Sequence, residues 1–457
     1  MEMASKNEFA ANSVLVSYFD PFDVFDALKE QFVEAFPLQN IHWKAPNGGL
    51  RTIEMVPVSL LTESKALESD TAASRLFLRF AAVNCISADD YRAKVRPLIR
   101  QWLPVNENGL WKEDLSHYPM PIILLYANSE VVDSKLFKST LLIDKFAKDF
   151  PNVKVLELKS VYKSPKEKKE FWGQIVQHLK SFVLNVFQNR LTSYQAQLSS
   201  MNKDAHWVEQ VRCRENILEL YMAMNLYDEA TNELREIKQC ITEHTKSELS
   251  SGTLEVPFKF SCETPRLAKL SDALSDGMLT KYHSLKYFFV NEFQLLAQDD
   301  AKEVDFLRMY RLISFFLHSI EQNFITEANI LEFKCSFLDH ILERLPHTKS
   351  TMGVQLRAEL VDCSIQGLLA CTEFTLISKQ ISIDRDAYTF GSLKETYSDE
   401  ATFHENYLKL TKKALSLFNQ CGRKRQRTVD ILSIEIGVLH HQRREHDKAV
   451  SLFLSCY

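Results

Sequence analysis

Short apolar runs alternate with amphipathic stretches over the first 190 residues. Continuous runs rich in Val, Ile, Leu and Phe predict strands that are buried on both faces. We expect them at Val14–Phe19, Phe77–Cys85, Ile122–Ala127 and Val153–Leu158, with a weaker strand over Arg51–Val58. Because a helical pattern separates these strands, the sequence predicts an α/β domain with a largely parallel sheet over residues 1–190.

Between the strands, apolar residues recur three and four positions apart. That spacing predicts helices over Val24–Phe36, Asp89–Trp102, Ser134–Asp149 and Pro165–Asn189. The polar stretch Leu61–Arg75 is expected to be a surface loop. The order of these elements is that of a Ras-like GTPase. Whether the domain can bind a nucleotide therefore depends on the residues in the two loops that would hold it.

From residue 191 to residue 457 the strand signal fades, and helical spacing predicts an α-solenoid. Three successive helices are expected to present apolar faces. These faces comprise Leu285, Phe288, Phe289, Phe293 and Leu296, then Leu307, Tyr310, Ile313, Phe316, Leu317 and Ile320, and then Ile330, Phe333, Phe337, Leu338 and Ile341. The Ser-, Thr- and Pro-rich segment Thr245–Asp276 is expected to be a flexible loop between helical groups.

The last stretch, Thr428–Tyr457, has the spacing of a tetratricopeptide hairpin. Its patterned positions are Gly437, Ala449, Phe453 and Cys456, at offsets of 12, 16 and 19 residues from the glycine. Tyr221, Ala230 and Leu234 give a looser version earlier in the chain. The alternative is an ordinary helical pair with chance small residues. The apolar face of Val450, Leu452, Phe453 and Leu454 needs a cover, so we expect a longer stack that is truncated at Tyr457.

Composition narrows the classes of function. The 55 Lys and Arg against 60 Asp and Glu give a net charge of −5, which argues against a dedicated nucleic-acid binder. With 11 glycines, the chain contains neither G-x-x-x-x-G-K-[ST] nor G-x-G-x-x-G. Nine dispersed cysteines without C-x-x-C predict buried, reduced thiols in the cytosol. The short apolar runs predict a protein that is soluble or at most peripheral to a membrane.

The two loops that bind the nucleotide in a GTPase lack the necessary residues. After the first strand, where glycines and a lysine would hold phosphate, the chain has Asp20, Pro21, Phe22 and Asp23. We expect the two carboxylates to repel phosphate and to cap the following helix. The loop after Ile122–Ala127 keeps Asn128 but has Val131 in place of the carboxylate that pairs with guanine. Nucleotide binding is therefore not expected.

Two basic groups are candidates for partner contact. Arg92, Arg96 and Arg100 lie four residues apart, which places them in one row on a helix. The second group is a short run between two helical segments, and it comprises Arg423, Lys424, Arg425 and Arg427. In both groups the alternative is a solvated surface.

Other chemistry finds little support in the sequence. The spacing of His440, His441 and His446 does not place three imidazoles around one metal on a helix face, so we expect solvent-exposed histidines. No Ser or Cys lies near a His and an acid in a spacing that indicates a nucleophile. We therefore expect no catalytic residue, no metal and no cofactor.

Five long runs carry a resemblance to a known family. They are Val16–Asp23, Asn40–Lys44, Tyr91–Leu98, Ile122–Asp133 and Val429–Gly437. Together they resemble the large subunit specific to the fungal TRAPP II tethering complex, whose animal counterpart is TRAPP complex subunit ten. The resemblance extends from Ser13 to Tyr457, and family members continue into further solenoid and β-sandwich domains.

The resemblance implies a non-enzymatic scaffold subunit in vesicle traffic. Its expected partners are other TRAPP subunits and, through the complex, Rab GTPases whose nucleotide exchange the complex promotes. The implied location is cytoplasmic, peripherally on late Golgi and trans-Golgi network membranes and in endosomal recycling. Two other classes remain open, namely a nucleotide-binding GTPase-like protein with a helical regulatory domain, and a self-assembling coat protein.

Overall fold

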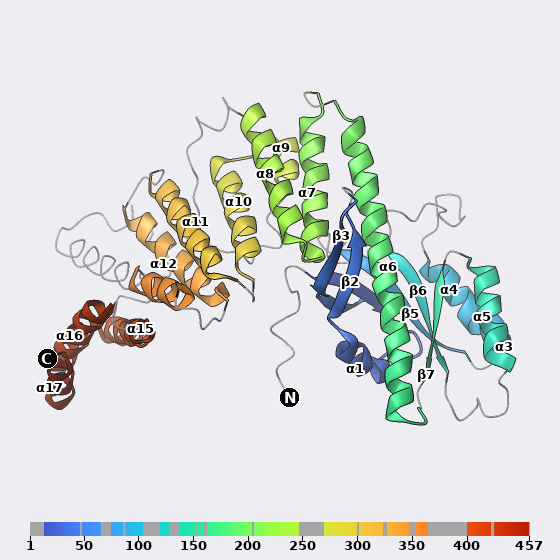
Figure 1. Ribbon diagram of the computed structural model, residues 1–457, viewed down its shortest axis with the longest axis horizontal. Coiled ribbons are helices and arrows are strands. Elements are labelled where there is room, and N and C mark those ends of the chain that lie inside the picture. The colour runs from blue at the N-terminus through green and yellow to red at the C-terminus, as the bar shows by residue number, and fades with distance from the viewer. Residues whose placement is uncertain are drawn as a thin grey trace. The chain divides into compact units, whose positions relative to one another are not determined.

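A computed structural model divides the chain into two compact units, Met1–Cys240 and Ile241–Tyr457. The residues that it describes are 13–45, 48–64, 75–85, 88–103, 119–127, 137–151, 153–159, 162–202, 205–245, 269–298, 301–322, 327–346, 352–363, 400–421 and 425–456. The prediction of an α/β part followed by helices is confirmed within these ranges (Figure 1).

A parallel sheet forms the centre of the first unit. Its strands are β1 (Val14–Phe19), β4 (Val58–Thr62), β5 (Leu76–Asn84), β6 (Met120–Ala127) and β7 (Lys154–Lys159), and they lie in the order β4-β1-β5-β6-β7. All four pairings are parallel. The four main predicted strands are therefore confirmed to within two residues, whereas the likeness to a GTPase stays a prediction.

Helices cover both faces of this sheet. On one face, α1 (Asp26–Ala35) packs Phe32 against Phe80 of β5 at a ring distance of 5.5 Å, and against Trp172 of α6 (Pro165–Ser200) at 5.2 Å. The opposite face is covered by α3 (Ala88–Asp90), the π-helical turn η1 (Tyr91–Val95), α4 (Arg96–Trp102) and α5 (Phe137–Asp149). Burial on both faces is why β1, β5 and β6 read as continuous apolar runs.

The long helix α6 is tied to the sheet by a buried arginine. Arg190 is 2% exposed, donates to the Leu76 carbonyl at 2.8 Å and lies 5.2 Å from the Phe77 ring centroid. Burial lowers the pKa of this guanidinium to about 10. The helix continues eleven residues beyond the predicted end at Asn189. It therefore crosses residue 190, where the sequence predicts a domain boundary, and that boundary stays a prediction.

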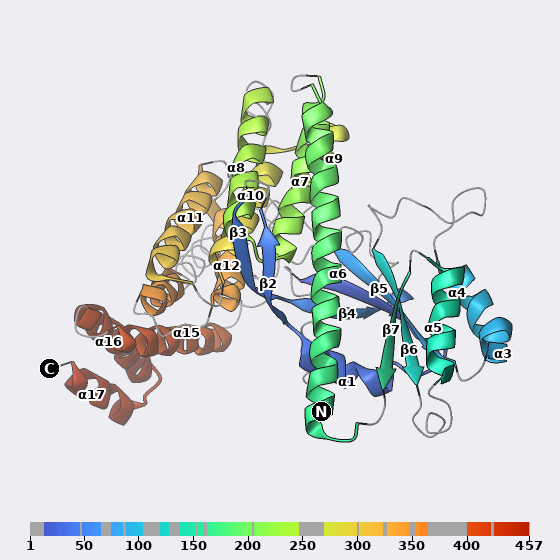
Figure 2. The ribbon, with the colours of Figure 1, turned by 45° about the vertical axis from the view of Figure 1, so that its right-hand side comes forward.

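A two-stranded hairpin packs against the helices that follow the sheet. The antiparallel strands β2 (Leu38–Lys44) and β3 (Leu50–Val56) lie beside α6 and α7 (Trp207–Ala223) in Figures 1 and 2. Trp43 of β2 is 1% exposed, with Phe187 at 5.5 Å and Tyr221 at 6.5 Å between ring centroids. The predicted strand over Arg51–Val58 is confirmed to within two residues as β3, which ends at Val56, and Pro57 separates it from β4.

The helices α7 and α8 (Tyr227–His244) are consecutive, and they contain the looser of the two predicted hairpins. Tyr221, Ala230 and Leu234 are all buried. At the turn, Asn225 adopts a φ of 55° and donates from its side chain to the Met55 carbonyl at 3.0 Å. Membership of the tetratricopeptide class stays a prediction.

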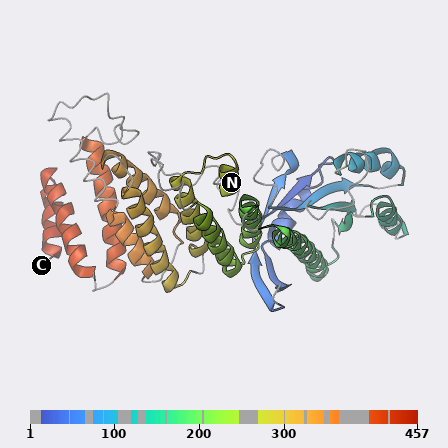
Figure 3. The same ribbon diagram turned by 90° about the horizontal axis from the view of Figure 1, so that it is seen from above.

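The second unit is helical throughout its described residues, which fits the expected α-solenoid, and Figure 3 shows its helices side by side. The elements are α9 (Leu270–Ser275), α10 (Lys281–Leu296), α11 (Glu303–Glu321), α12 (Glu327–Arg344), a helical stretch over 352–363, α15 (Glu400–Gln420), α16 (Gln426–Gln442) and α17 (His446–Ser455). The expected loop Thr245–Asp276 is wrong at its end, since α9 occupies 270–275, and residues 246–268 lie outside the described ranges.

Stacked phenylalanines fill the core of the second unit. The ring of Phe316 lies 4.4 Å from Phe289 and 5.1 Å from Phe337, which joins α11 to α10 and α12. Offset aromatic pairs of this kind add to the energy of apolar burial. The predicted apolar face of α11 is wrong in two places, because Leu307 and Tyr310 are exposed while Phe306 and Met309 are buried.

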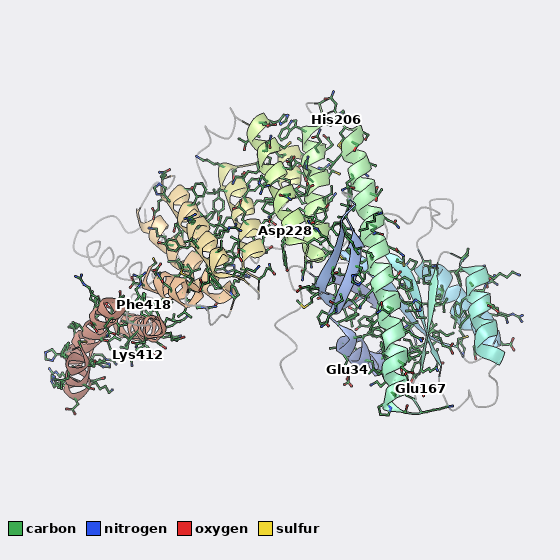
Figure 4. All side chains as sticks on the ribbon, viewed as in Figure 1. Glu34, Glu167, His206, Asp228, Lys412 and Phe418 are labelled. Atoms are coloured by element: carbon green, nitrogen blue, oxygen red, sulfur yellow. The ribbon has the colours of Figure 1, made fainter. Side chains whose placement is uncertain are left out.

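Side chains cover the described elements of both units densely (Figure 4). The figure labels Glu34 near the end of α1 and Glu167 near the start of α6. Lys168 of α6 pairs with Glu34 at 3.8 Å. This exposed ion pair marks where α1 ends against the first turn of α6, and contacts of this kind contribute little to stability.

Candidate functional site: the carboxyl edge of the parallel sheet

The ends of β1 and β5 mark the place where a sheet of this topology would bind a ligand. The chain passes from β1 to β4 on one side, and then from β4 to β5 on the other side of β1. Ligands of open parallel sheets bind at the carboxyl edge where the strand order reverses in this way. Asp20, the first residue after β1, lies at that point.

The carboxylate of Asp20 is engaged with the turn before α1. Its Oδ1 accepts from the Val24 amide at 3.0 Å, and its Oδ2 accepts from the Phe25 amide at 2.8 Å. A phosphate bound here would need amide groups of this kind. These two amides precede α1, whose cap residue Phe25 receives no side-chain cap hydrogen bond, so the expected capping of the helix is wrong in position and Asp20 instead binds the turn before α1. Asp23 adopts a φ of 51°, and within the described residues its carboxylate forms no hydrogen bond to α1.

Aromatic packing holds this loop in this conformation. The ring of Phe25 stacks on Tyr18 of β1 at 4.1 Å and lies 5.7 Å from Phe32 of α1. Phe25 is fully buried, and Phe22 packs against the apolar cluster on the opposite face of the sheet. The loop is therefore anchored by side chains on both faces of the sheet.

A second group of side chains closes the sheet beside β1. Glu63 follows β4, Arg79 lies in β5 and Trp102 ends α4. The Trp102 indole donates to Glu63 Oε2 at 2.7 Å, Arg79 forms an ion pair with Glu63, and Arg79 also donates to the Trp102 carbonyl at 3.3 Å. The Arg79 guanidinium lies 4.8 Å from the Trp102 ring centroid, which adds a cation–π contact.

This Glu63–Arg79–Trp102 cluster is half-buried and internally satisfied. The side chains of Arg79 and Glu63 are 17% and 13% exposed, and Phe19 stacks on Trp102 at 6.4 Å. Because Glu63 neutralises Arg79, this arginine does not supply the positive charge that a phosphate site needs. The cluster therefore holds the end of β4, the strand β5 and the end of α4 together. The other predicted nucleotide loop, Asn128–Val131, lies outside the described residues.

The arginine row is only partly available for a partner. Arg96 pairs with Asp149 of α5 at 3.0 Å, and Tyr91 donates to the same carboxylate at 2.8 Å. Burial, followed by the Asp149 contact, raises the pKa of Tyr91. Arg92 and Arg100 are exposed, and Arg92 makes a loose 3.8 Å contact with Asp89. Partner binding by this row stays a prediction.

The second basic run is described only in part. Arg423 and Lys424 lie outside the described residues. Arg425 forms an ion pair with Glu359, whereas Arg427 is exposed. Contact of this run with a partner or membrane also stays a prediction.

The histidines near the last hairpin are not all exposed, and the expectation is wrong for His440. His440 is 5% exposed, and its Nδ1 lies 2.8 Å from Glu445 Oε2. Lys448 donates to the same oxygen at 2.9 Å. Lys448 and His440 hold the pKa of Glu445 below its ordinary value. His441 and His446 are exposed, with ring centroids 5.1 Å apart.

Metal-binding groups and membrane-spanning helices are absent from the described ranges. There, no group of three or more His, Cys, Asp and Glu side chains is arranged to hold a metal ion, and no helix combines the length and apolar character that crossing a bilayer requires. The side chains of six cysteines are described, and none of the six forms a disulfide within the described ranges. Cys85, Cys213 and Cys421 are buried as expected, whereas Cys363 is exposed.

Comparison with known proteins gives two family matches. Residues 9–205 match the N-terminal family model of trafficking protein particle complex subunit 10-like proteins, and residues 307–457 match the TR130 NTS domain. The chain is 44% identical over 456 residues to the trafficking protein particle complex II-specific subunit 130 of Saccharomyces cerevisiae, a match that covers 98% of this chain and 41% of that protein.

The chain is a relative of the TRAPP II-specific subunit. The resemblance predicted from the sequence is thereby confirmed. It is also 26% identical over 95 residues to trafficking protein particle complex subunit 10 of Dictyostelium discoideum, which covers 20% of this chain and 7% of that protein. The chain spans about two fifths of the length of the yeast subunit.

The two family matches coincide with structural elements. The match to the subunit 10-like model begins before β1 and includes all of α6, so it contains the Asp20 loop and the Glu63–Arg79–Trp102 cluster. The match to the TR130 NTS domain begins within α11 and includes α16 and α17. Four of the five runs that resemble the TRAPP II-specific subunit lie in the first match and one in the second.

Sequence reasoning missed the Glu63–Arg79–Trp102 cluster. Glu63 belongs to a stretch that was predicted to be a loop, and it lies 16 residues from Arg79 and 39 from Trp102. Such spacing carries no local periodicity that a single sequence could reveal. The one available signal was an arginine inside an otherwise apolar strand, because a buried charge requires a partner.

Proposed function

We propose that this chain is a non-catalytic scaffold subunit of a TRAPP II-type tethering complex. In this role it binds other TRAPP subunits and helps to position Rab GTPases for nucleotide exchange by the complex. The proposed place of action is the cytoplasmic side of late Golgi and trans-Golgi network membranes and the endosomal recycling route. The observation that carries the proposal is the high identity to the yeast TRAPP II-specific subunit along nearly the whole chain.

Two structural features support a positioning role over nucleotide chemistry. The Asp20 carboxylate accepts hydrogen bonds from the amides of Val24 and Phe25, just before α1, and Glu63 neutralises Arg79 of β5. Within the second unit the described helices pack around a common apolar core, and stacked helices of this kind present extended binding surfaces.

Affinity purification tests the proposal directly. The chain, tagged and expressed in cells, should recover the small TRAPP core subunits in near-stoichiometric amounts. If the parent chain recovers no TRAPP subunit, the proposal is wrong.

A GTPase-like nucleotide-binding protein is the alternative function. It is distinguished by calorimetry of the purified chain with GTP and with GDP in the presence of magnesium. Heat of binding at micromolar affinity would favour this alternative. The engaged Asp20 carboxylate supports the opposite result, because it already accepts hydrogen bonds from the amides that would hold a phosphate.

A further inference from the structure

Helix α11 is apolar on two sides. Its inner side contributes Phe306, Met309, Ile313, Phe316 and Ile320 to the core of the second unit. Its outer side exposes Val304, Leu307 and Phe315, at 59%, 39% and 61%. Figure 2 labels α11 beside α10 and α12, which cover the inner side. A surface helix normally has one apolar stripe, so the outer one indicates a binding surface.

The outer apolar residues lie on one side of α11, with Arg308 and Arg311 between Leu307 and Phe315 on that side. Val304, Leu307 and Phe315 are separated by three and eight residues, so they lie along one side of the helix. The stripe extends over about 16 Å, which is three helical turns. Tyr310, 43% exposed, lies at its margin. A ridge with this spacing is complementary to the apolar face of another helix.

Positive charge accompanies the stripe. Arg308 and Arg311 lie within its length, and α11 contains no Asp or Glu between Asp305 and Glu321. Arg308, whose side chain is 64% exposed, is 3.7 Å from Asp305. Arg311 is exposed and has no ion pair with any described residue. A partner that covers the stripe would therefore gain from carboxylates beside its own apolar residues.

We propose that the outer stripe of α11 binds an acidic amphipathic helix of a protein partner. In this complex, apolar side chains of the partner cover Val304, Leu307 and Phe315, and its Asp or Glu residues pair with Arg308 and Arg311. The inference rests on the proposed scaffold role, since it names the chemistry of one partner surface. Burial of the apolar anchors sets the dissociation rate, and the arginines select for acidic partners.

The test uses the full chain and two designed peptides. Both are labelled 18-residue amphipathic helices with leucines on one face, flanked by Glu in one peptide and by Lys in the other. We expect fluorescence anisotropy to show binding of the Glu peptide at least about tenfold tighter than of the Lys peptide. Leu307→Ser with Phe315→Ser should abolish binding, and Arg308→Glu with Arg311→Glu should reverse the preference.

A matched control exists on α16, where Ile431 and Val438 are exposed to a similar degree, at 47% and 44%. The Ile431→Ser and Val438→Ser variant should bind the Glu peptide like the parent. Unchanged thermal unfolding of every variant shows that the fold is intact. Equal binding of both peptides, or loss of binding in the α16 variant instead, would overturn the proposal.

Two other occupants give distinct results. If the α11 variants abolish binding to vesicles of anionic lipid and leave the Glu peptide bound, the surface meets a membrane. If they abolish self-association in sedimentation, the surface meets a second copy of the chain. Either result would overturn the proposal. Recovery of TRAPP subunits is measured separately, so peptide binding without such recovery would contradict the scaffold role while supporting the acidic-helix site.

Discussion

Gly437 of α16 and Phe453 of α17 meet where the two helices of the last hairpin cross. A Cβ atom at position 437 would lie 2.6 Å from Cε1 of Phe453, which is closer than packed carbons approach one another. A glycine in the middle of a helix normally lowers its stability. Here it allows the aromatic ring of one helix to lie against the backbone of the other.

Replacing Gly437 with alanine should therefore destabilise the hairpin. The better helix propensity of alanine contributes about 1 kcal/mol, but overpacking against Phe453 costs about 1–3 kcal/mol. We expect the free energy of unfolding to fall by about 1 kcal/mol. Adding Phe453→Leu should remove the clash and reverse the sign of the Gly437→Ala effect, as measured by urea unfolding.

Gly173 of α6 provides the matched control for this prediction. It is an exposed glycine inside a helix, and a Cβ there would meet no atom within 4 Å. Gly173→Ala should raise the stability by up to about 1 kcal/mol through propensity alone. If both substitutions have the same effect, the contact with Phe453 does not limit residue 437.

The Asp20 carboxylate should matter for folding and not for nucleotide binding. Asp20→Ala leaves the amides of Val24 and Phe25 without their acceptor and should cost about 1–2 kcal/mol of stability. Asp20→Asn keeps one acceptor oxygen and should cost less. Calorimetry with GTP or GDP should show no heat of binding for the parent or either variant. Nucleotide binding that appears only after removal of the carboxylate would indicate a site blocked by Asp20.

Trp43 should anchor the β2–β3 hairpin against helices α6 and α7. Its ring is buried against Phe187 of α6 and Tyr221 of α7. Trp43→Ala should cost about 3–5 kcal/mol, because it leaves a large cavity, whereas Trp43→Phe should cost less. Amide exchange should rise in β2, β3 and the end of α7. Unchanged protection there would show that the indole is not the anchor.

The two exposed arginines of the row provide a test of partner contact that leaves the fold intact. Arg92→Glu with Arg100→Glu should slow incorporation into a TRAPP complex at low salt, because charges at the rim of an interface mainly affect association. Arg96 is left unchanged, since its reversal would also break the pair with Asp149. Lys94→Glu, an exposed residue outside the row, is the control. Equal incorporation of all variants would identify the row as a solvated surface.

His340 of α12 should make the second unit sensitive to acid. Burial, followed by the charges of Arg344 and Lys286, lowers the pKa of His340 from 6.5 to about 4. Below its ordinary pKa the unfolded chain binds a proton that the folded chain does not, so stability decreases as the pH falls. Urea unfolding at about pH 7 and about pH 5 should show a smaller decrease for His340→Gln than for the parent. An identical decrease would show that other groups carry the effect.

Local pattern was sufficient to predict most elements of the sheet domain. Three of the four main strands, β1, β5 and β6, are buried on both faces, so their sequences are continuous apolar runs that can be recognised without tertiary information, whereas the edge strand β7 alternates apolar and polar residues. Strand β2 was missed because its buried residues alternate with exposed polar ones over only seven positions, within a segment that lacks a long apolar run. Its partner strand β3 was predicted to continue two residues further, across Pro57 to the first residue of β4.

The amphipathic face of α11 shows where periodicity fails. The sequence offered two apolar sides, and the prediction placed Leu307 and Tyr310 inside. The packing of Phe289 and Phe337 around Phe316 instead selects the side that contains Phe306 and Met309. A helix that is apolar on two sides has no unique inward direction until its neighbours are known.

By itself, the sequence determined the class of the fold, the absence of both glycine-rich phosphate motifs and the family to which the chain is related. These three properties depend on residue types at short spacing and on continuous runs that resemble the family. Both are visible in the sequence without knowledge of the fold. Only the tertiary structure decided that Glu63, Arg79 and Trp102 form a cluster, that Arg96 is paired with Asp149, and which side of α11 is exposed. These contacts join elements that are far apart in the chain. A single sequence does not show which of its distant residues come into contact, because folding alone brings them together.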